Sequence, residues 1–207
     1  MHDTPWYGES VTPIPRGRPR SETARSEILL ATSTLLLERG FDQFTLAEVA
    51  LKAGVGKQTV YRWWATKASL VAECVLEGIL PVEADLVTPE DDPVAAIRTW
   101  LTVSAARLSQ PQQAALFRAL NAAAASDDVA RAKLTERFHE PLTAAITAAL
   151  HVGIVSGQLR ADLPVSAVTD MVIGTMSYSL MRPDGPGESW VEDIMSTLMI
   201  GITAKEF

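Results

Sequence analysis

The chain has 207 residues, of which 47% are hydrophobic and 21% charged, and its formal net charge is −7. These values are typical of a globular protein of one or two domains, long enough to bury a core without disulfides or metals. The single cysteine, Cys74, excludes an internal disulfide framework and fits a reducing cytoplasm. The longest apolar run, near 142–155, is shorter than the roughly 20 residues of a bilayer-spanning helix, and residues 1–10 lack a signal-peptide pattern. We therefore expect a cytoplasmic protein without a membrane span.

Charge is distributed unevenly along the chain. Residues 11–70 carry nine Lys/Arg and five Asp/Glu, which gives +4, whereas residues 71–207 carry nine Lys/Arg and eighteen Asp/Glu, which gives −9. This asymmetry predicts a basic binding module attached to an acidic body that does not contact polyanions.

The first 80 residues read as an arm followed by helices. Residues 1–20 contain four prolines and little apolar periodicity, which predicts a flexible arm. Apolar residues at helical spacing from Ile28 to Leu36 predict a first helix that stops at Gly40. The segment FTLAEV contains a capping box, Thr45-x-x-Glu48, which predicts the start of a second helix.

Two short helices are expected over 45–52 and 57–64, separated by the turn AGVG, and a further helix from Thr66 toward Leu80. Pro81 and the acidic stretch TPEDDP predict a break near 81–91. Asp92-Pro93 is then a favourable cap and first turn. Further helical stretches follow over 93–109, 111–125, 127–156, 164–181 and 188–205.

Strand signals are absent from the sequence, so the predicted fold class is all-α. The predicted organisation is a flexible basic arm over 1–20, a three-helix domain over 21–68, and a helical body over 69–207.

The two short helices joined by a glycine turn predict a helix-turn-helix, whose second helix places its leading residues against base edges in the major groove. Lys57, Gln58 and Thr59 occupy that leading turn, and their amide, ammonium and hydroxyl groups suit bases and phosphates. Val60 and Trp64, four residues apart, are expected in the core. The residues expected to contact phosphates are Thr45, Tyr61, Trp63 and Lys67.

Residues 22–70 resemble the DNA-binding domain of TetR-type (TetR/AcrR) transcriptional regulators. The segments ILLA…LLLERGF, TLAEVALKAGVG and TVYRWWATKASLV carry the resemblance. Tyr61 and Lys67 match the family ending Tyr-x-His-Phe-x-x-Lys, whereas Trp63-Trp64 replaces His-Phe. The resemblance implies a fourth helix that links the domain to the body. The resemblance also implies a homodimer that acts as a repressor. Such a dimer binds a palindromic operator in double-stranded DNA, and a small-molecule inducer releases it from the DNA.

The arm contains Arg16-Gly-Arg-Pro-Arg20, which has the core of an AT-hook. An extended Arg-Pro stretch fits the narrow minor groove of A·T-rich DNA, so we expect Arg18 and Arg20 to bind there. The alternative is a solvated basic tail.

The body offers fewer candidate site residues. Large side chains at helical spacing could line a ligand pocket, with ordinary core packing as the alternative for each: Trp100, Phe117, Phe138, Met171, Met176 and Tyr178. Glu136-x-x-His139 imitates half of a carboxylate metal site, but no second copy exists, so no metal or other cofactor is expected. Cys74 is expected to pack on the fourth helix, with redox sensing as the alternative. No nucleophile elbow or phosphate-binding loop is present, and an enzyme is not expected.

The last two helices, over 164–205, combine methionines, small residues and β-branched side chains with few charges. This composition predicts burial against a second copy, with Gly174 and Gly201 allowing close approach. An intrachain core is the alternative. For the whole chain, the main rival function is a helical small-molecule-binding protein with a non-functional helix-turn-helix.

Overall fold

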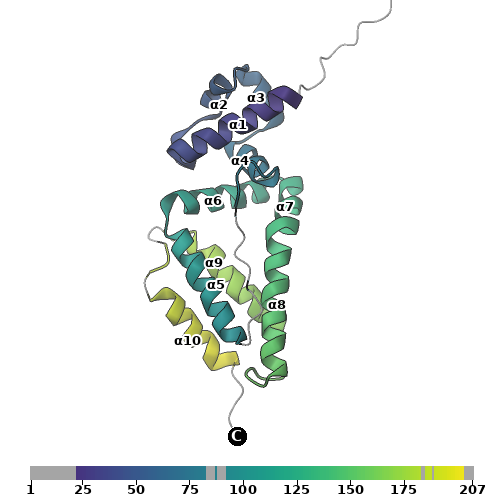
Figure 1. The fold of residues 1–207 in the computed structure, drawn as a ribbon, viewed down its shortest axis with the longest axis vertical. Helices are drawn as coiled ribbons and strands as arrows, with labels where there is room; N and C mark the ends of the chain where they lie inside the picture. Colours follow the sequence, from purple (N-terminus) through teal and green to yellow (C-terminus); the bar gives the residue numbers. More distant parts are fainter. Residues whose placement is uncertain (1–21, 83–86, 88–91, 183–184, 188, 203–207) are drawn as a thin grey trace, which may run out of the picture.

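The computed structural model describes residues 22–82, 87, 92–182, 185–187 and 189–202. Within these ranges every regular element is a helix, which confirms the all-α prediction. The predicted arm over 1–20, with Arg18 and Arg20, lies outside the described residues (Figure 1).

Five helical elements form the described N-terminal part, residues 22–82, and local signals set most of their ends. Gly40 ends the first helix with φ +79°, a conformation that favours glycine. Thr45 and Glu48 form the predicted capping box, and Thr66 forms a second one with Ser69. The elements are α1 (Glu22–Arg39), η1 (Phe41–Gln43), α2 (Leu46–Lys52), α3 (Lys57–Trp63) and α4 (Lys67–Leu76).

Helix α4 ends before the predicted Leu80. The chain turns at Gly78, whose φ is +73°. The N–H groups of Ile79 and Leu80 both donate to the carbonyl oxygen of Cys74, at 2.9 and 3.1 Å. This turn satisfies the end of the helix and brings Leu80 back onto the core, where it is 3% exposed.

Seven helical elements form the body, near the predicted ranges. Asp92 and Asp127 cap two of them, each accepting two backbone N–H groups. Helices α7 and α8 and the π-helical turn η2 between them run on as one rod, which Figure 1 shows as the long green helix. The elements are α5 (Pro93–Leu108), α6 (Pro111–Ser126), α7 (Asp128–Leu134), η2 (Thr135–His139), α8 (Glu140–Val155), α9 (Val165–Ser179) and α10 (Trp190–Ile202).

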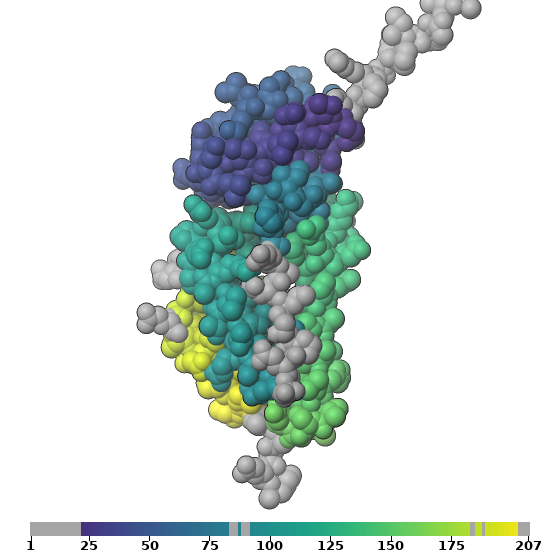
Figure 2. All heavy atoms as spheres, in the orientation of Figure 1, coloured from purple at the N-terminus to yellow at the C-terminus, as the bar shows by residue number. Residues whose placement is uncertain are grey.

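Helix α4 lies between the two parts of the molecule. It packs on α1 on one side and on α6 and α7 on the other. The hydrophobic core around α1–α4 accordingly continues into the body through Leu116, Leu120 and Leu134. A second core lies wholly within the body. The space-filling view shows the first four helices seated directly on the body (Figure 2). The division at 68/69 stays a prediction, because the residues after it belong to the first core.

The helical run Asp128–Val155 is 28 residues long and contains an 18-residue stretch of mean hydropathy 1.2. By length and composition alone this helical run could cross a bilayer. The apolar run near 142–155, taken from the sequence, is shorter and did not indicate this. The face of the helical run containing Ile146, Leu150 and Gly153 is buried in the body core. It packs on α5 and α9, so one face of it belongs to the body core, although only 22% of the apolar stretch is buried.

The ammonium group of Lys67 forms hydrogen bonds within the N-terminal part of the chain. Its Nζ donates to the carbonyl oxygens of Phe41 and Phe44, the second at 2.8 Å. It also lies 4.4 and 4.8 Å from the two ring centroids. Burial lowers the pKa of Lys67. Lys67 therefore joins the start of α4 to the segment before α2, and only its third N–H is left for the phosphate contact predicted for it.

Replacing Lys67 with Met is expected to lower the free energy of unfolding by about 1–3 kcal/mol, because two backbone carbonyls lose their donor. Urea denaturation followed by circular dichroism measures this. Lys52→Met is the control, since Lys52 is exposed and its only ion pair in the described residues spans 3.8 Å. Unchanged stability of Lys67→Met, with weaker DNA binding, would instead assign Lys67 to a phosphate.

Cys74 packs in α4 as predicted. Its side chain is 0% exposed, and Sγ contacts the carbonyl oxygen of Leu29 at 3.5 Å. Burial raises the pKa of the Cys74 thiol to about 12. A buried thiol with little thiolate is a poor nucleophile, which argues against the redox-sensor alternative.

We expect Cys74 of the folded protein to resist a thiol-specific reagent such as 5,5′-dithiobis(2-nitrobenzoic acid) at pH 8. A pKa near 12 leaves roughly a thousandfold less thiolate than an unperturbed cysteine has at the same pH. The reaction, followed by absorbance, should proceed at once in urea. Full labelling of the folded protein within minutes would contradict this description of the thiol.

Candidate functional site

The helix-turn-helix consists of α2 and α3, packed against each other. The turn between them closes where the N–H of Val55 donates to Ala50 at 3.0 Å and Gly54 takes φ +66°. Val60 and Trp64 are 0% and 2% exposed, which confirms the prediction that both are core residues. These contacts fix the face that α3 turns outward.

The leading turn of α3 faces solvent. Lys57 and Gln58 are exposed and Thr59 is half-buried. Within the described chain, none of these three side chains has a hydrogen bond or ion pair to another residue. Tyr61, 54% exposed, and Arg62 lie further along the same helix. Sequence reasoning did not select Arg62, although a basic residue on this helix was a usable signal.

The residues predicted to contact phosphates are placed differently from one another. The hydroxyl of Thr45 accepts from the N–H of Glu48 and donates to Glu48 Oε2 at 2.9 Å. Trp63 stacks on Trp64 with ring centroids 5.6 Å apart and packs partly against the core. Thr45 and Tyr61 are both exposed, and Tyr61 is the member of this set with no hydrogen bond to another described residue.

A cluster of charges fixes the end of α3 to α4 and α1. The indole N–H of Trp64 donates to Glu73, which also accepts from Arg25. Arg25 donates to Glu77 as well, at 2.7 Å. Hydrogen bonding to Glu77 and Glu73 raises the pKa of Arg25. The recognition helix, the first helix and α4 are thus joined at one carboxylate.

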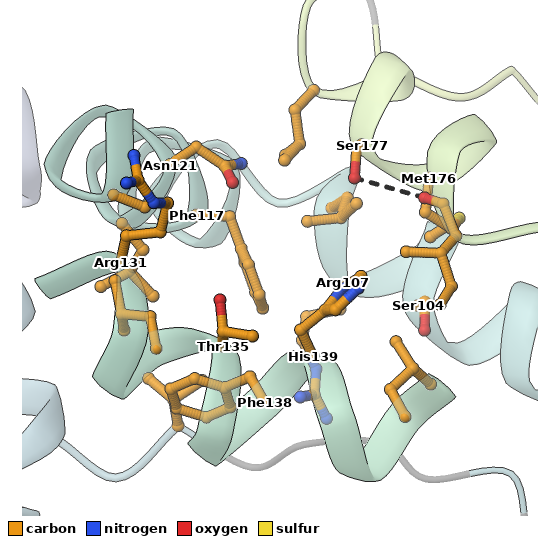
Figure 3. Close-up of a pocket in the computed structure, with 18 of the residues that line it drawn as sticks. Ser104, Arg107, Phe117, Asn121, Arg131, Thr135, Phe138, His139, Met176 and Ser177 are labelled. Atoms are coloured by element: carbon orange, nitrogen blue, oxygen red, sulfur yellow. Dashed lines mark hydrogen bonds between the residues drawn. The ribbon is translucent and has the colours of Figure 1, made fainter. Parts of the chain in front are cut away.

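The body contains a cavity of about 410 Å³. It lies among α5, α6, α7, η2, α8 and α9, and Figure 3 shows the side chains around it. Most are apolar, with a few polar and basic groups among them. The lining residues are Val82, Trp100, Ser104, Arg107, Leu108, Phe117, Leu120, Asn121, Ala124, Arg131, Leu134, Thr135, Phe138, His139, Leu142, Ile173, Met176, Ser177 and Leu180.

Four of the six body residues selected from sequence line this cavity: Trp100, Phe117, Phe138 and Met176. Met171 and Tyr178 do not, and their placement at this pocket is corrected. They are 59% and 65% exposed, because helical spacing puts them on the face of α9 opposite to Met176.

Sequence reasoning missed the basic and polar groups of the cavity. Ser104 and Arg107 follow Trp100 on one face of α5, so their spacing was a signal. His139 and Glu136 are both exposed, but His139 lines the cavity beside Phe138 and Glu136 does not. The described residues contain no group of three or more side chains suited to hold a metal ion.

The cavity wall is connected to α4. Thr135, Phe138 and His139 belong to the π-helical turn η2 and line the cavity. Arg137, within the same turn, donates to the carbonyl oxygen of Leu76 at 2.8 Å. Because Leu76 is the last residue of α4, one turn of helix contacts both the cavity and the helix that carries Glu73.

Comparisons with known proteins agree with this architecture. Residues 28–74 match the family model described as bacterial regulatory proteins, tetR family, and residues 87–198 match the tetracyclin repressor-like C-terminal domain. An uncharacterised helix-turn-helix regulator of Bacillus subtilis, YdeS, is 30% identical over 192 residues, covering 91% of this chain and 94% of that protein. The repressor TetR of Mycobacteroides abscessus is 23% identical over 164 residues, covering 78% and 84% of the two chains.

Solved structures share the fold. RolR in complex with resorcinol aligns with a TM-score of 0.59 and 16% identity, covering 88% of each chain. A TetR regulator from Haloarcula marismortui aligns with a TM-score of 0.55 and 17% identity, covering 88% of this chain and 100% of the other. The helix-turn-helix, the helical body and the two matching family models lead to one conclusion: the chain belongs to the TetR family of helix-turn-helix transcriptional regulators.

Proposed function

We propose that this protein is a cytoplasmic repressor that binds a palindromic operator as a homodimer and leaves it when a small molecule enters the body cavity. The observation that carries the proposal is the leading turn of α3. There, Lys57, Gln58 and Thr59 face solvent on a helix held by a buried Val60. A helix in this setting fits the major groove, and its polar side chains can reach base edges.

The exposed side chains of α3 are proposed to contact different parts of the DNA, some the bases and others the backbone. The amide of Gln58 can pair bidentately with adenine, whereas Lys57 suits guanine acceptors or a phosphate. Tyr61 and Arg62 are exposed further along α3 and suit the backbone. Arg18 and Arg20 of the arm are proposed for the neighbouring minor groove.

The proposed dimer uses α9 and α10. Four large apolar side chains on or next to these helices are exposed in the protomer: Met171, Tyr178, Met181 and Ile200, at 59%, 65%, 79% and 89%. A Cβ placed on Gly174 or Gly201 would meet nothing within 4 Å, so both positions leave room for a partner helix. An apolar surface of this kind supports pairing with a second copy.

Release would pass through α4. A ligand that moves η2 also moves Arg137, and with it the end of α4 at Leu76. Glu73 then carries the displacement to Trp64 at the end of α3. The two α3 helices of a dimer must match half-sites about 34–36 Å apart, so a small displacement costs much of the specific binding.

The rival function, a small-molecule-binding protein with a non-functional helix-turn-helix, predicts no salt-sensitive affinity for DNA. The test is fluorescence anisotropy of the purified protein on the duplex upstream of its own gene, beside a scrambled duplex, across salt concentrations. A repressor of its own gene binds the first duplex more tightly, with two protomers per site and a linear loss of affinity in log salt. Equal and weak binding to both duplexes would favour the rival.

Gln58→Ala is expected to relax the preference at one base-pair position of each half-site by about 1–3 kcal/mol, because one bidentate pair is lost. Anisotropy titrations with operator variants changed at single positions measure this. Gln158→Ala, at an exposed position after α8, is the control and should bind like wild type. An equal loss of affinity at every position for Gln58→Ala would contradict a base-reading role.

Ile200→Arg is expected to convert the dimer to monomer without unfolding the protomer, because Ile200 is 89% exposed and packs on nothing that a charge would disturb. Sedimentation velocity should show the monomer at concentrations where wild type is dimeric. Operator affinity should fall at least about tenfold, or about 1.4 kcal/mol. Leu37→Arg, at a 72% exposed position on α1, is the control. A dimeric Ile200→Arg variant would place the interface elsewhere.

A further inference from the structure

We infer that the body cavity binds an amphipathic carboxylate: a molecule with an apolar ring or chain whose acid group is held by Arg107. The inference rests on the proposed function for the consequence of binding, release from DNA. The binding itself is argued from the cavity and is tested without DNA.

The size and apolar character of the cavity define one part of the ligand. Its volume of about 410 Å³ falls within the roughly 300–1,000 Å³ of small-molecule pockets and suffices for one ring system or a medium-length chain. Trp100, Phe117 and Phe138 supply aromatic faces, and aliphatic side chains come from each of the helices α5 to α9. Such a surface favours an apolar body over a sugar or a nucleotide.

The basic residues of the lining define the other part. Arg107, Arg131 and His139 line the cavity, whereas its described lining contains no Asp or Glu. A cationic ligand would therefore meet arginine without a compensating carboxylate, which is costly in a mostly apolar space. An anionic ligand would instead find arginine side chains of opposite charge, so the described lining favours acids over cations.

Arg107 is the basic group best placed to take the acid. Arg131 and His139 are both exposed, Arg131 with 56% of its side chain in solvent. Arg107 is half-buried and comes from α5, one turn after Ser104. In Figure 3, Arg107 lies on the same side of the view as Ser104 and Ser177, with Arg131 and Asn121 on the other side.

Arg107 has an interaction of its own in the protein, and this does not prevent carboxylate binding. A guanidinium has five N–H donors, so it can hold a carboxylate through two of them and keep another partner. Such bidentate pairs are among the stronger polar contacts in proteins. The apolar remainder of the ligand then extends toward the aromatic side chains.

The test compares 4-phenylbutyrate with 4-phenylbutan-1-ol and 4-phenylbutylammonium, which share the ring and chain and differ in the head group. Isothermal titration calorimetry on the full-length protein without DNA gives each affinity. Wild type is expected to bind the acid at least about tenfold more tightly than either analogue. Arg107→Gln should lose this preference while its affinity for the alcohol stays within about twofold, and Arg107→Lys, which keeps the charge, should retain part of it.

Arg118→Gln is the matched control, because it removes the same charge from an exposed position on α6 that does not line the cavity. Circular dichroism confirms that each variant is folded. If Arg107→Lys keeps part of the preference for the acid, the loss in Arg107→Gln is due to the missing charge and not to a change of structure. The inference is overturned if wild type does not bind the acid, if the ammonium analogue binds as well, or if Arg107→Gln weakens all three compounds equally.

Anisotropy on the operator duplex separates this inference from the proposed function. Selective binding of the acid that fails to release DNA would leave the ligand class standing and overturn release by that ligand class. A protein that binds neither duplex but still selects the acid through Arg107 would overturn the repressor function alone.

Discussion

The structure depends on the burial of α4 on two sides at once. Leu70, Val71 and Val75 are 0% exposed, although the helix has only ten residues. One side packs on α1 and the other on α6 and α7, so a shift of the body cannot be absorbed by slippage at α4. Close-packed interfaces transmit displacement because they leave no voids to deform into. The position of α3 relative to the body is set by this helix.

The recognition helix needs that support because it is too short to be stable alone. Helix α3 has seven residues, and an isolated helix of that length does not persist in water. Val60 is its one fully buried residue, with Trp64 closing its end and donating to Glu73. Because Val60 and Trp64 hold the helix in place, the side chains of the leading turn are not needed for its stability and can be polar. The same arrangement explains why a basic module can be attached to an acidic body: apart from the Arg137–Leu76 hydrogen bond, the contacts described between them are apolar.

Local signals made most of the helices predictable, whereas contacts between distant segments did not follow from sequence. The Thr45–Glu48 box and Asp92-Pro93 fix helix starts through neighbouring atoms, and both were visible as motifs. Lys67 was assigned to a phosphate by motif, but its partners are carbonyls 23 and 26 residues away. Helical spacing likewise divided α9 into two faces without showing which face enters the cavity. Met171 and Tyr178 were therefore selected beside Met176.

The π-helical turn η2 lies between the body cavity, the proposed ligand site, and α4, which supports the proposed DNA-binding helix. Adjacent residues there have opposite surroundings: Phe138 and His139 line the cavity, and Arg137 reaches Leu76 of α4. A π turn holds an extra residue relative to an α turn, so its side chains rotate as a group if the turn is rewound. A ligand can drive such a change only by the difference in its affinity for the two arrangements. Binding of a carboxylate at Arg107, as inferred above, would select the ligand. It would not by itself make the ligand bind one arrangement of η2 more tightly than the other. In the proposed mechanism this difference would arise at Phe138 and His139, because they line the cavity and share the turn η2 with Arg137.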